Sequence, residues 1–535
     1  MSASLAAVPT PARRSDHGSP GLPRPARVPG TTLADLADSV GAVLRPGTAG
    51  GTVVHGVTLD SRQVRPGDLY AALPGARAHG ADFAAQAAAA GAVAAVTDLA
   101  GVQRVGGAGL PALVVADPRA VLGALAADVY GRPAADLLLL GVTGTNGKTT
   151  TVHLLDAALR AAGRRTGLVG TVEVRVGDER VPSSRTTPES PDVHALLAVM
   201  RERGVTACSM EVSSHALALH RVDGVVYDVA AFTNLSQDHL DFHRDMADYY
   251  AAKATLFTPA RSRRGVVCVD DEWGRRLARQ AAVPVVTVTT RPDADADWTA
   301  GPGQPDPSGT TTAFTLRHRD GRRHRLVSPL PGDFNVANTA LAFVVLLEAG
   351  LDPEAAAAGL AGAPGVPGRM EPVRTGAPGE PLALVDYAHT PDALAAALRA
   401  LRPATPGRLV VVLGAGGDRD PGKRPAMGEA AARGADLVVV TDDNPRSEDP
   451  ATIRAAVLQG ARAAGGADVL EVPDRAEAVA VALAATTGPQ DTVLLAGKGH
   501  ESGQEVDGTV HPFDDRVVLR AALAARAAVA PEAGR

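Results

Sequence analysis

The sequence has few cysteines, few aromatic residues and no long apolar run. Its 535 residues include only two cysteines, Cys208 and Cys268, which lie far apart within apolar stretches. This spacing fits neither a disulfide framework nor a metal motif, so we expect both to be reduced core residues of a cytosolic protein. Aromatic residues make up 3% of the chain, and abundant alanine indicates helices that pack closely through small side chains.

The absence of two further features argues against a membrane protein and against a nucleic-acid-binding protein. No apolar run approaches the roughly 20 residues that span a bilayer, so we expect no membrane insertion. The net charge is −6 and no basic stripe stands out, which argues against a nucleic-acid partner. Residues 1–30 are rich in Pro, Ser and Arg and lack an apolar signal core, so we expect a disordered extension. We therefore expect a cytoplasmic monomer.

Length and the alternation of strand and helix patterns predict three α/β domains in a row. A stretch rich in proline and glycine at residues 361–373 marks the second boundary. We place the domains at residues 31–135, 136–363 and 364–535. The central domain is expected to resemble a P-loop ATPase with a mostly parallel sheet, and the third to be Rossmann-like.

A phosphate-binding loop is predicted in "LLLLGVTGTNGKTTTVHLLDAAL", residues 137–159. An apolar strand is followed by Gly144, Gly147 and Lys148, and then by a helix pattern that begins with Thr149. Backbone N–H groups, a lysine and a helix N-terminus together favour a nucleotide phosphate. The first glycine of the strict pattern lies one residue too early, so a chance Gly-Lys-Thr is the alternative.

Polar side chains follow two more apolar strands of the central region. "MEVSSH" places Glu211 at a strand end, where it is a candidate metal ligand or a cap. "TNLSQDHLDFH" contains His239 and His243, which would share one face of a helix; the alternative is a polar helix start. Lys253 lies among apolar and aromatic neighbours, so it either extends to the surface or works in a site.

Together these segments resemble the Mur ligase family, which builds the peptide of the bacterial cell wall. The motifs come in the family's order between about Leu59 and about Phe513. They are "TGTNGKTT", "EVSSH", "DHLDFH" with a lysine shortly after, "GDFNVANTA", "GRME" and "DYAHTPD".

The resemblance implies that the protein uses ATP and Mg²⁺. It implies catalytic roles for Lys148, His239 and Lys253, with Lys253 converted by carbon dioxide to a carbamate (N6-carboxylysine). The metal ligands would be Thr149, Glu211 and His239. The implied ATP-binding positions are Gly144, Thr145, Asn146, Gly147, Lys148, Thr149, Thr150, Asn335, Asn338, Arg369, Asp386 and His389.

The second implied substrate is UDP-N-acetylmuramoyl-L-alanyl-D-glutamate. The implied contacts lie in "VTLDSR" of the first domain and in "SRTTPES", "EVSSH" and "ALHRVDG" of the second. They are Leu59, Ser61, Thr186, Thr187, Ser213, Leu219 and Arg221. Members often have glutamine where this chain has Leu219, which weakens one expected contact.

Three loops of the third domain each follow an apolar strand: "GAGGDRDPGKR", "DDNPR" and "GKGHE". Parallel strands would bring the starts of these loops to one edge of a sheet. Arginines and acids there suit a zwitterion, and the alternative is a set of surface ion pairs. The predicted pocket residues are Arg419, Asp443, Asn444, Pro445, Arg446, Gly497 and Glu501.

"DNPR" resembles the form of the family that adds meso-2,6-diaminopimelate, because forms that add L-lysine lack this arginine. The resemblance thus implies an ATP-dependent ligase that joins diaminopimelate to the dipeptide substrate through an acyl phosphate. The alternatives are a lysine-adding ligase, an enzyme like folylpolyglutamate synthase, and an inactive nucleotide-binding partner in cell-wall assembly.

Overall fold

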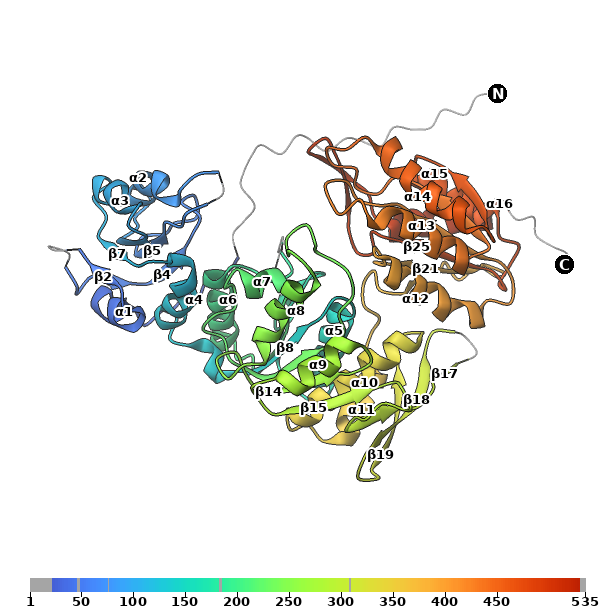
Figure 1. The fold of residues 1–535 in the computed structure, drawn as a ribbon, viewed down its shortest axis with the longest axis horizontal. Coiled ribbons are helices and arrows are strands. Elements are labelled where there is room, and N and C mark those ends of the chain that lie inside the picture. The colour runs from blue at the N-terminus through green and yellow to red at the C-terminus, as the bar shows by residue number, and fades with distance from the viewer. Residues whose placement is uncertain (1–21, 46–48, 76, 182–184, 307–308, 530–535) are drawn as a thin grey trace.

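The computed structural model describes residues 22–45, 49–75, 77–181, 185–306 and 309–529. Three α/β units follow one another, with the central unit lying between the first and the third (Figure 1). The predicted fold class, with a mostly parallel sheet in the central domain, is confirmed. Within the described part of the chain, no helix is both long and apolar enough to cross a membrane.

The first domain contains a small sheet with strand order β2-β7-β6-β5-β4, parallel except for β2. A fully buried core of leucine, valine and alanine lies between this sheet and helices α1 and α4. The strands are β1 (Thr31–Thr32), β2 (Val43–Leu44), β3 (Val53–Val54), β4 (Gly56–Thr58), β5 (Asp68–Ala71), β6 (Ala94–Thr97) and β7 (Ala112–Val114). The helices are α1 (Leu33–Val40), α2 (Ala84–Ala89), α3 (Val102–Gly107) and α4 (Pro118–Val129).

Residues 22–30 belong to the stretch that the sequence predicts to be disordered, yet they make specific contacts. Arg24 Nη1 lies 2.6 Å from Asp68 Oδ2 of the first domain. The backbone N–H groups of Ala26 and Arg27 donate to the Glu202 carboxylate of the central domain, at 3.0 and 2.7 Å. Anchors at distant sequence positions hold this segment, so its own composition does not reveal its order. Residues 1–21 lie outside the described residues.

The central domain is built on a sheet that the structure describes as twelve-stranded, in the order β11-β10-β9-β12-β8-β13-β14-β15-β16-β18-β17, with β19 paired to β18. The seven neighbouring strands β9, β12, β8, β13, β14, β15 and β16 run parallel, and antiparallel strands extend both edges of the sheet. The strands are β8 (Leu138–Thr143), β9 (Thr166–Val169), β10 (Val174–Val176), β11 (Glu179–Val181), β12 (Ala207–Glu211), β13 (Tyr227–Phe232), β14 (Ser262–Cys268), β15 (Val285–Thr289), β16 (Trp298–Ala300), β17 (Gln304–Pro305), β18 (Thr312–His318) and β19 (Arg323–Ser328).

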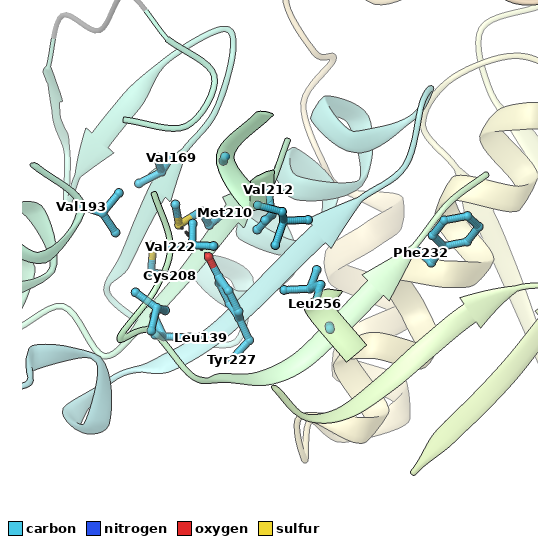
Figure 2. Packing of buried hydrophobic residues seen from close by; sticks show 14 of the residues in the cluster. Leu139, Val169, Val193, Cys208, Met210, Val212, Val222, Tyr227, Phe232 and Leu256 are labelled. Carbon is cyan, nitrogen blue, oxygen red and sulfur yellow. Dashed lines mark hydrogen bonds between the residues drawn. The ribbon is translucent and has the colours of Figure 1, made fainter. Parts of the chain in front are cut away.

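Helices cover both faces of this sheet, which explains why its central strands are continuous apolar runs. One core cluster lies under α6 to α9 and another under α5, α10 and α11. In the first cluster, the Tyr227 hydroxyl donates to Met210 Sδ at 3.2 Å beside buried Cys208 (Figure 2). The helices are α5 (Lys148–Ala161), α6 (Ser190–Glu202), α7 (Ser214–Ala218), α8 (Met246–Ala254), α9 (Glu272–Gln280), α10 (Asp333–Glu348) and α11 (Pro353–Ala361).

The third domain forms its own sheet with strand order β20-β21-β25-β22-β23-β24. All its pairings are parallel except that of β20, so β25, β22 and β23 end side by side at one edge. The strands are β20 (Glu371–Pro372), β21 (Leu382–Asp386), β22 (Leu409–Leu413), β23 (Leu437–Val440), β24 (Asp468–Glu471) and β25 (Thr492–Ala496), followed by the hairpin β26 (Gly503–Val506) and β27 (Thr509–Pro512). The helices are α12 (Pro391–Leu401), α13 (Lys423–Gly434), α14 (Pro450–Ala464), α15 (Arg475–Ala484) and α16 (Asp515–Val529).

A buried ion pair fastens the last helix to this domain. Arg475 of α15 and Asp515 of α16 are both 0% exposed, with 2.7 Å between Arg475 Nη2 and Asp515 Oδ2. Arg475 Nη2 also donates to the carbonyl of Ala496, at the end of β25, at 3.0 Å. The pair therefore joins two helices to the strand end from which one of the predicted pocket loops starts.

We expect Arg475→Met to lower the free energy of unfolding of the third domain by about 3–5 kcal/mol, because Asp515 would remain buried without its partner. Urea unfolding, followed by hydrogen exchange in peptides of α15 and α16, measures this loss. The exposed pair of Arg433 and Glu429 on α13 provides the control, since Arg433→Met should cost less than about 1 kcal/mol. Equal losses in the two variants would contradict the expectation.

Candidate active site

The predicted phosphate loop lies between β8 and α5, and two of its glycines are required by their surroundings. Gly144 has φ of 146° and Gly147 has φ of 86°. A Cβ on Gly144 would lie 1.8 Å from Thr233 Oγ1, and one on Gly147 would lie 2.3 Å from Asn338 Oδ1. Neither position accepts a side chain, so the backbone packs directly against neighbouring segments. The N-terminus of α5, at Lys148, faces the opening of the loop.

Lys148 turns back over this loop. Its ammonium donates to the carbonyls of Gly144 at 3.0 Å and Thr145 at 2.8 Å. Burial lowers the pKa of the Lys148 ammonium below its ordinary value, while the charge of Glu211 works in the opposite direction. A cation is thus held at the helix N-terminus, where an anion is already favoured.

Glu211 and Thr149 lie beside the loop, as the sequence predicts. Glu211 ends β12, is 1% exposed, and accepts a hydrogen bond from Thr149 Oγ1 at 3.1 Å. Thr171 donates to the same carboxylate through its N–H at 2.7 Å and its hydroxyl at 3.1 Å. Sequence reasoning missed Thr171, although it follows the end of β9 and the strand-end rule would have found it.

His239 lies on a turn with φ of 56°, so the helical pairing considered for His239 and His243 does not form. His239 Nε2 is 3.6 Å from Asp238 Oδ2, and its ring centroid is 4.9 Å from that of His215. Burial lowers the pKa of His239, which favours the neutral ring that metals bind. His243 is instead buried, with its Nδ1 3.5 Å from Asp248 Oδ2.

Lys253 points inward from α8 rather than to the surface. It is 1% exposed, and its ammonium donates to the carbonyl of Gly144 at 2.8 Å. The same nitrogen lies 4.6 Å from the centroid of the Tyr249 ring. Burial first, and then the positive charge of Lys148, lower the pKa of the Lys253 ammonium well below its ordinary value. The lysine therefore lies against the phosphate loop with a raised tendency to be neutral.

The third domain reaches this loop across the domain boundary. Arg369 Nη2 donates to Thr149 Oγ1 at 3.2 Å, and the guanidinium lies 4.3 Å from the Tyr387 ring centroid. His389 Nε2 is 4.0 Å from Asp238 Oδ2. Two of the implied ATP-binding residues, Arg369 and His389, therefore reach the central domain from the third.

Asp386 and the paired asparagines lie around the same region, with the asparagines buried and Asp386 half-buried. Asp386 ends β21 and accepts from the N–H of Met370 at 2.7 Å; burial raises the pKa of its carboxyl. On α10, Asn338 Nδ2 donates to Asn335 Oδ1 at 3.1 Å, and Asn335 Nδ2 donates to the carbonyl of Pro331 at 2.8 Å. The two amides thus hold each other at the end of α10 that meets the loop.

The loops after β22, β23 and β25 come together, as the strand-end rule predicts. Arg446 has φ of 52°; its Nη1 donates to the carbonyl of Gly417 at 2.6 Å, and its Nε lies 3.4 Å from Glu505 Oε2. A Cβ on Gly497 would lie 2.8 Å from Asp443 Oδ2. These contacts join separate loops at one edge of the sheet.

One cleft of about 1050 Å³ brings most of the predicted residues together. Those that line it are Thr145, Asn146, Gly147, Lys148, Thr149, Thr150, Thr186, Thr187, Glu211, Ser213, Arg221, His239, Lys253, Asn335, Asn338, Arg369, Asp386, His389, Arg419, Asp443, Asn444, Arg446, Gly497 and Glu501. Other lining residues were not predicted, among them His215, Asp238 and Tyr387. Tyr387 directly follows the end of β21, so the strand-end rule that would have found Thr171 would also have found Tyr387. Asp238 immediately precedes His239 inside a quoted motif.

Some predicted residues lie outside this cleft. Among the described residues of the first domain, Leu59 and Ser61 do not line it, and Ser61 Oγ donates to Gln86 Oε1 at 2.9 Å. Leu219 and Pro445 contribute no lining surface either, and Gly144 lies behind the loop with its carbonyl toward the two lysines. For Leu59 and Ser61 the placement of the first domain decides this, and domain placement leaves no trace in local sequence.

Arg221 and Thr187 form the side of the cleft nearest the first domain. Thr187 Oγ1 donates to the carbonyl of Glu211 at 2.9 Å. Arg221 Nε lies 2.9 Å from Glu189 Oε1, and Arg119 of α4 reaches the same carboxylate at 3.2 Å. A charged junction therefore connects the first domain to the edge of the cleft.

Comparisons with known proteins agree with these observations. Family models match residues 53–130 (Mur ligase family, catalytic domain), 142–346 (Mur ligase middle domain) and 368–499 (Mur ligase, glutamate ligase domain). The UDP-N-acetylmuramoyl-L-alanyl-D-glutamate--2,6-diaminopimelate ligase of Streptomyces coelicolor is 58% identical, over 94% of this chain and 98% of its own length.

Two further relatives extend the comparison. The UDP-N-acetylmuramyl-tripeptide synthetase of Leifsonia xyli is 49% identical, over 94% of this chain and 98% of its own. A solved structure of a UDP-N-acetylmuramoyl-L-alanyl-D-glutamate--2,6-diaminopimelate ligase superposes with a TM-score of 0.65 at 32% identity, covering 93% of this chain and 99% of that one. Matched models in all three domains and high identity over nearly the whole length lead to one conclusion: the chain belongs to the Mur ligase family.

Proposed function

We propose that the protein is an ATP-dependent ligase that joins meso-2,6-diaminopimelate to UDP-N-acetylmuramoyl-L-alanyl-D-glutamate. One observation carries the proposal: the phosphate loop of the central domain and the Arg446 pocket of the third domain line the same cleft. A nucleotide phosphate and a charged amino acid would therefore meet in one cleft. The names of the relatives at 58% and 32% identity support the same substrates.

The chemistry follows from the charges on this cleft. A carboxylate is a poor acyl donor, so an oxygen of the dipeptide carboxylate attacks the γ-phosphorus and the bond to ADP breaks. The amine of the incoming amino acid then attacks the acyl carbon, a tetrahedral intermediate forms, the amine loses its proton, and phosphate leaves. Lys148 would hold the β- and γ-phosphates while two mutually repelling anions approach. Arg369 and His389 would close over the nucleotide from the third domain, and Asn335 and Asn338 would face adenine.

The donor groups beside the loop fit a magnesium ion. Thr149 and Glu211 offer a hydroxyl and a carboxylate 3.1 Å apart, and Mg²⁺ typically takes one or two carboxylates together with substrate phosphates and water. Within the described residues, no group of three or more His, Cys, Asp or Glu side chains could hold a metal alone. His239 would serve a second ion through its neutral ring. Bound magnesium would supply charge neutralisation on the phosphates.

At the other end, Thr186, Thr187, Ser213 and Arg221 would contact the dipeptide. Leu59, Ser61 and Leu219 would serve the uridine nucleotide and its linkage outside the cleft. The charged junction of Arg119, Glu189 and Arg221 lies where the substrate would pass from the first domain to the phosphate loop. Substrate length thus accounts for predicted contacts both inside and outside the cleft.

Lys253 is proposed to work as a carbamate. Carbon dioxide reacts with a neutral amine, and burial beside Lys148 lowers the pKa of this ammonium. The product would be an anion at the phosphate loop, able to pair with Lys148 and with magnesium.

We expect Lys253→Ala to be nearly inactive and to recover partly when short carboxylates such as acetate are added. The added anion would occupy the space left by the carbamate. Initial rates with and without acetate, in variant and native enzyme, measure the recovery, and chloride at equal ionic strength is the control. No recovery, together with an unmodified lysine in a crystal structure, would contradict the carbamate.

The proposed reaction is tested by one coupled assay of ADP release. We expect release only when ATP, UDP-N-acetylmuramoyl-L-alanyl-D-glutamate and meso-diaminopimelate are all present. Release with L-lysine instead would identify a lysine-adding ligase, and release with a folate and glutamate would identify a folylpolyglutamate synthase. Nucleotide binding without release under any condition would identify an inactive binding partner.

A further inference from the structure

A buried lysine of the third domain has no part in the function described so far. Lys498 follows β25, and its side chain is 0% exposed. Its ammonium donates to the carbonyl of Gly503 at 2.6 Å, to Asn444 Oδ1 at 3.2 Å and to Glu501 Oε2 at 3.4 Å. A lysine has three N–H donors, so each donor has a partner. An ammonium buried this completely is costly unless it is paired, as it is here.

Lys498 determines which way the amide of Asn444 points. Asn444 Oδ1 receives two donors that cannot accept, the Lys498 ammonium and the N–H of Glu505 at 3.0 Å. Asn444 Nδ2 therefore lies on the opposite side, where it donates to Glu501 Oε2 at 2.8 Å. If the amide rotated by half a turn, its NH₂ group would meet two donors and its oxygen would meet a carboxylate. The orientation of Asn444 in the pocket is thus determined by groups outside it.

The same ammonium connects the pocket to the hairpin that supports Arg446. Gly503, whose carbonyl accepts from Lys498, begins β26. The carbonyl of Glu505 in this strand accepts from the N–H of Arg446 at 3.0 Å, and the N–H of Asp507, in the turn after the strand, donates to the carbonyl of Arg446 at 2.8 Å. The backbone of Arg446, in its left-handed conformation, is held by these two bonds.

We propose that Lys498 is a positioning residue for the amino-acid substrate, one that sets the donor pattern of Asn444 and holds the Glu501 carboxylate in place without touching the substrate. This proposal rests on the proposed function, because it takes the pocket of Asn444, Glu501 and Arg446 to be the site for diaminopimelate. Lys498 itself does not line the cleft, whereas these three residues do. Its effect is therefore expected on amino-acid binding and selection rather than on ATP.

Lys498→Met keeps the length of the side chain and removes its charge and donors. We expect the Michaelis constant for meso-diaminopimelate to rise about 10- to 100-fold, because a buried amide oxygen and a carboxylate lose a charged partner. The Michaelis constants for ATP and for the uridine substrate should stay within about twofold of those of the native enzyme, since neither site contacts Lys498. Steady-state kinetics with each substrate varied in turn measures this separation.

A double-mutant cycle with Asn444→Ala distinguishes positioning from a general loss of stability. If Lys498 acts through Asn444, the double variant should raise the diaminopimelate constant by less than the product of the two single effects. Arg454→Met is the matched control, because it removes a buried cation of the same domain whose partners, Asp442 and Glu471, do not line the cleft. That variant should leave all three Michaelis constants near their native values.

The outcomes are separable. Native enzyme that releases no ADP with diaminopimelate would contradict the proposed function itself. If the native enzyme is active, two results would overturn the role of Lys498. One is a folded Lys498→Met variant whose Michaelis constant for diaminopimelate is unchanged. The other is a double variant whose Michaelis constant rises by the full product of the two single effects. If the variant does not fold, a crystal structure of native enzyme with diaminopimelate decides. Bonds kept to Asn444 and Glu501 support the role, and direct contact between the Lys498 ammonium and the amino acid overturns it.

Discussion

Lys148→Ala is expected to reduce ADP release by about a thousandfold or more while the protein stays folded. Loss of a single preorganised donor to a developing charge already costs about 10²- to 10³-fold, and Lys148 would contribute a full positive charge to the phosphates. Its ammonium bonds only the carbonyls of its own loop within the described structure, so no core contact is lost. The coupled assay under saturating substrates measures the effect.

The control for Lys148 is Arg160→Ala on the same helix. Arg160 is exposed near the other end of α5 and pairs with Asp178, so its removal should leave turnover near that of the native enzyme. Circular dichroism and thermal unfolding of both variants establish that they are folded. Near-normal activity of a folded Lys148→Ala variant would show that the phosphate-loop assignment is wrong.

Arg446→Ala is expected to raise the Michaelis constant for diaminopimelate sharply and to change that for ATP little. Diaminopimelate and lysine differ by one distal carboxylate, which a guanidinium grips in bidentate fashion. With lysine bound, that guanidinium lacks its ligand, and we expect this to give native enzyme a preference of roughly a thousandfold or more. The variant should reduce the difference in kcat/KM between diaminopimelate and lysine. It should not make lysine a good substrate, because the rest of the pocket is unchanged.

Glu505 gives the Arg446 guanidinium a partner within the protein, since Arg446 Nε lies 3.4 Å from Glu505 Oε2. With lysine bound, only the part of the guanidinium that faces the cleft loses a ligand, so we expect the preference at the lower end of this range. Arg433→Ala is the control, since Arg433 pairs with Glu429 on the exposed face of α13. Kinetics with both amino acids decide the matter. An unchanged diaminopimelate constant in Arg446→Ala, or native enzyme that prefers lysine, would contradict the assignment.

Local sequence was sufficient to predict the strand, loop and helix of the phosphate loop. The strand before it, the two glycines and the helix after it are consecutive in the chain, so the pattern can be recognised without knowledge of the distant segments that pack against it. The positions of Glu211 and of the loops after β22, β23 and β25 could be predicted from sheet topology as well as from local sequence. Parallel strands of one sheet end at one edge, so apolar runs followed by polar residues imply which side chains meet.

Contacts between distant segments could not be predicted in this way. Arg369 reaches Thr149 across 220 positions of the chain, and residues 22–30 are ordered by carboxylates at Asp68 and Glu202. Lys498 shows the same limit, because its position between Gly497 and Gly499 does not reveal a side chain that bonds Asn444, 54 positions away.

The sequence by itself determined the family resemblance through its motifs and their order. It also determined the three α/β units and the groups that follow each strand, because periodicity and strand-end position are local properties of the chain. Only the tertiary structure decided which of those groups share a cleft, which lie outside it as Leu59 and Ser61 do, and which buried cations orient them. The physical reason is that domain placement and buried polar networks depend on the packing of segments far apart in the chain. No local pattern encodes the distance between two such segments.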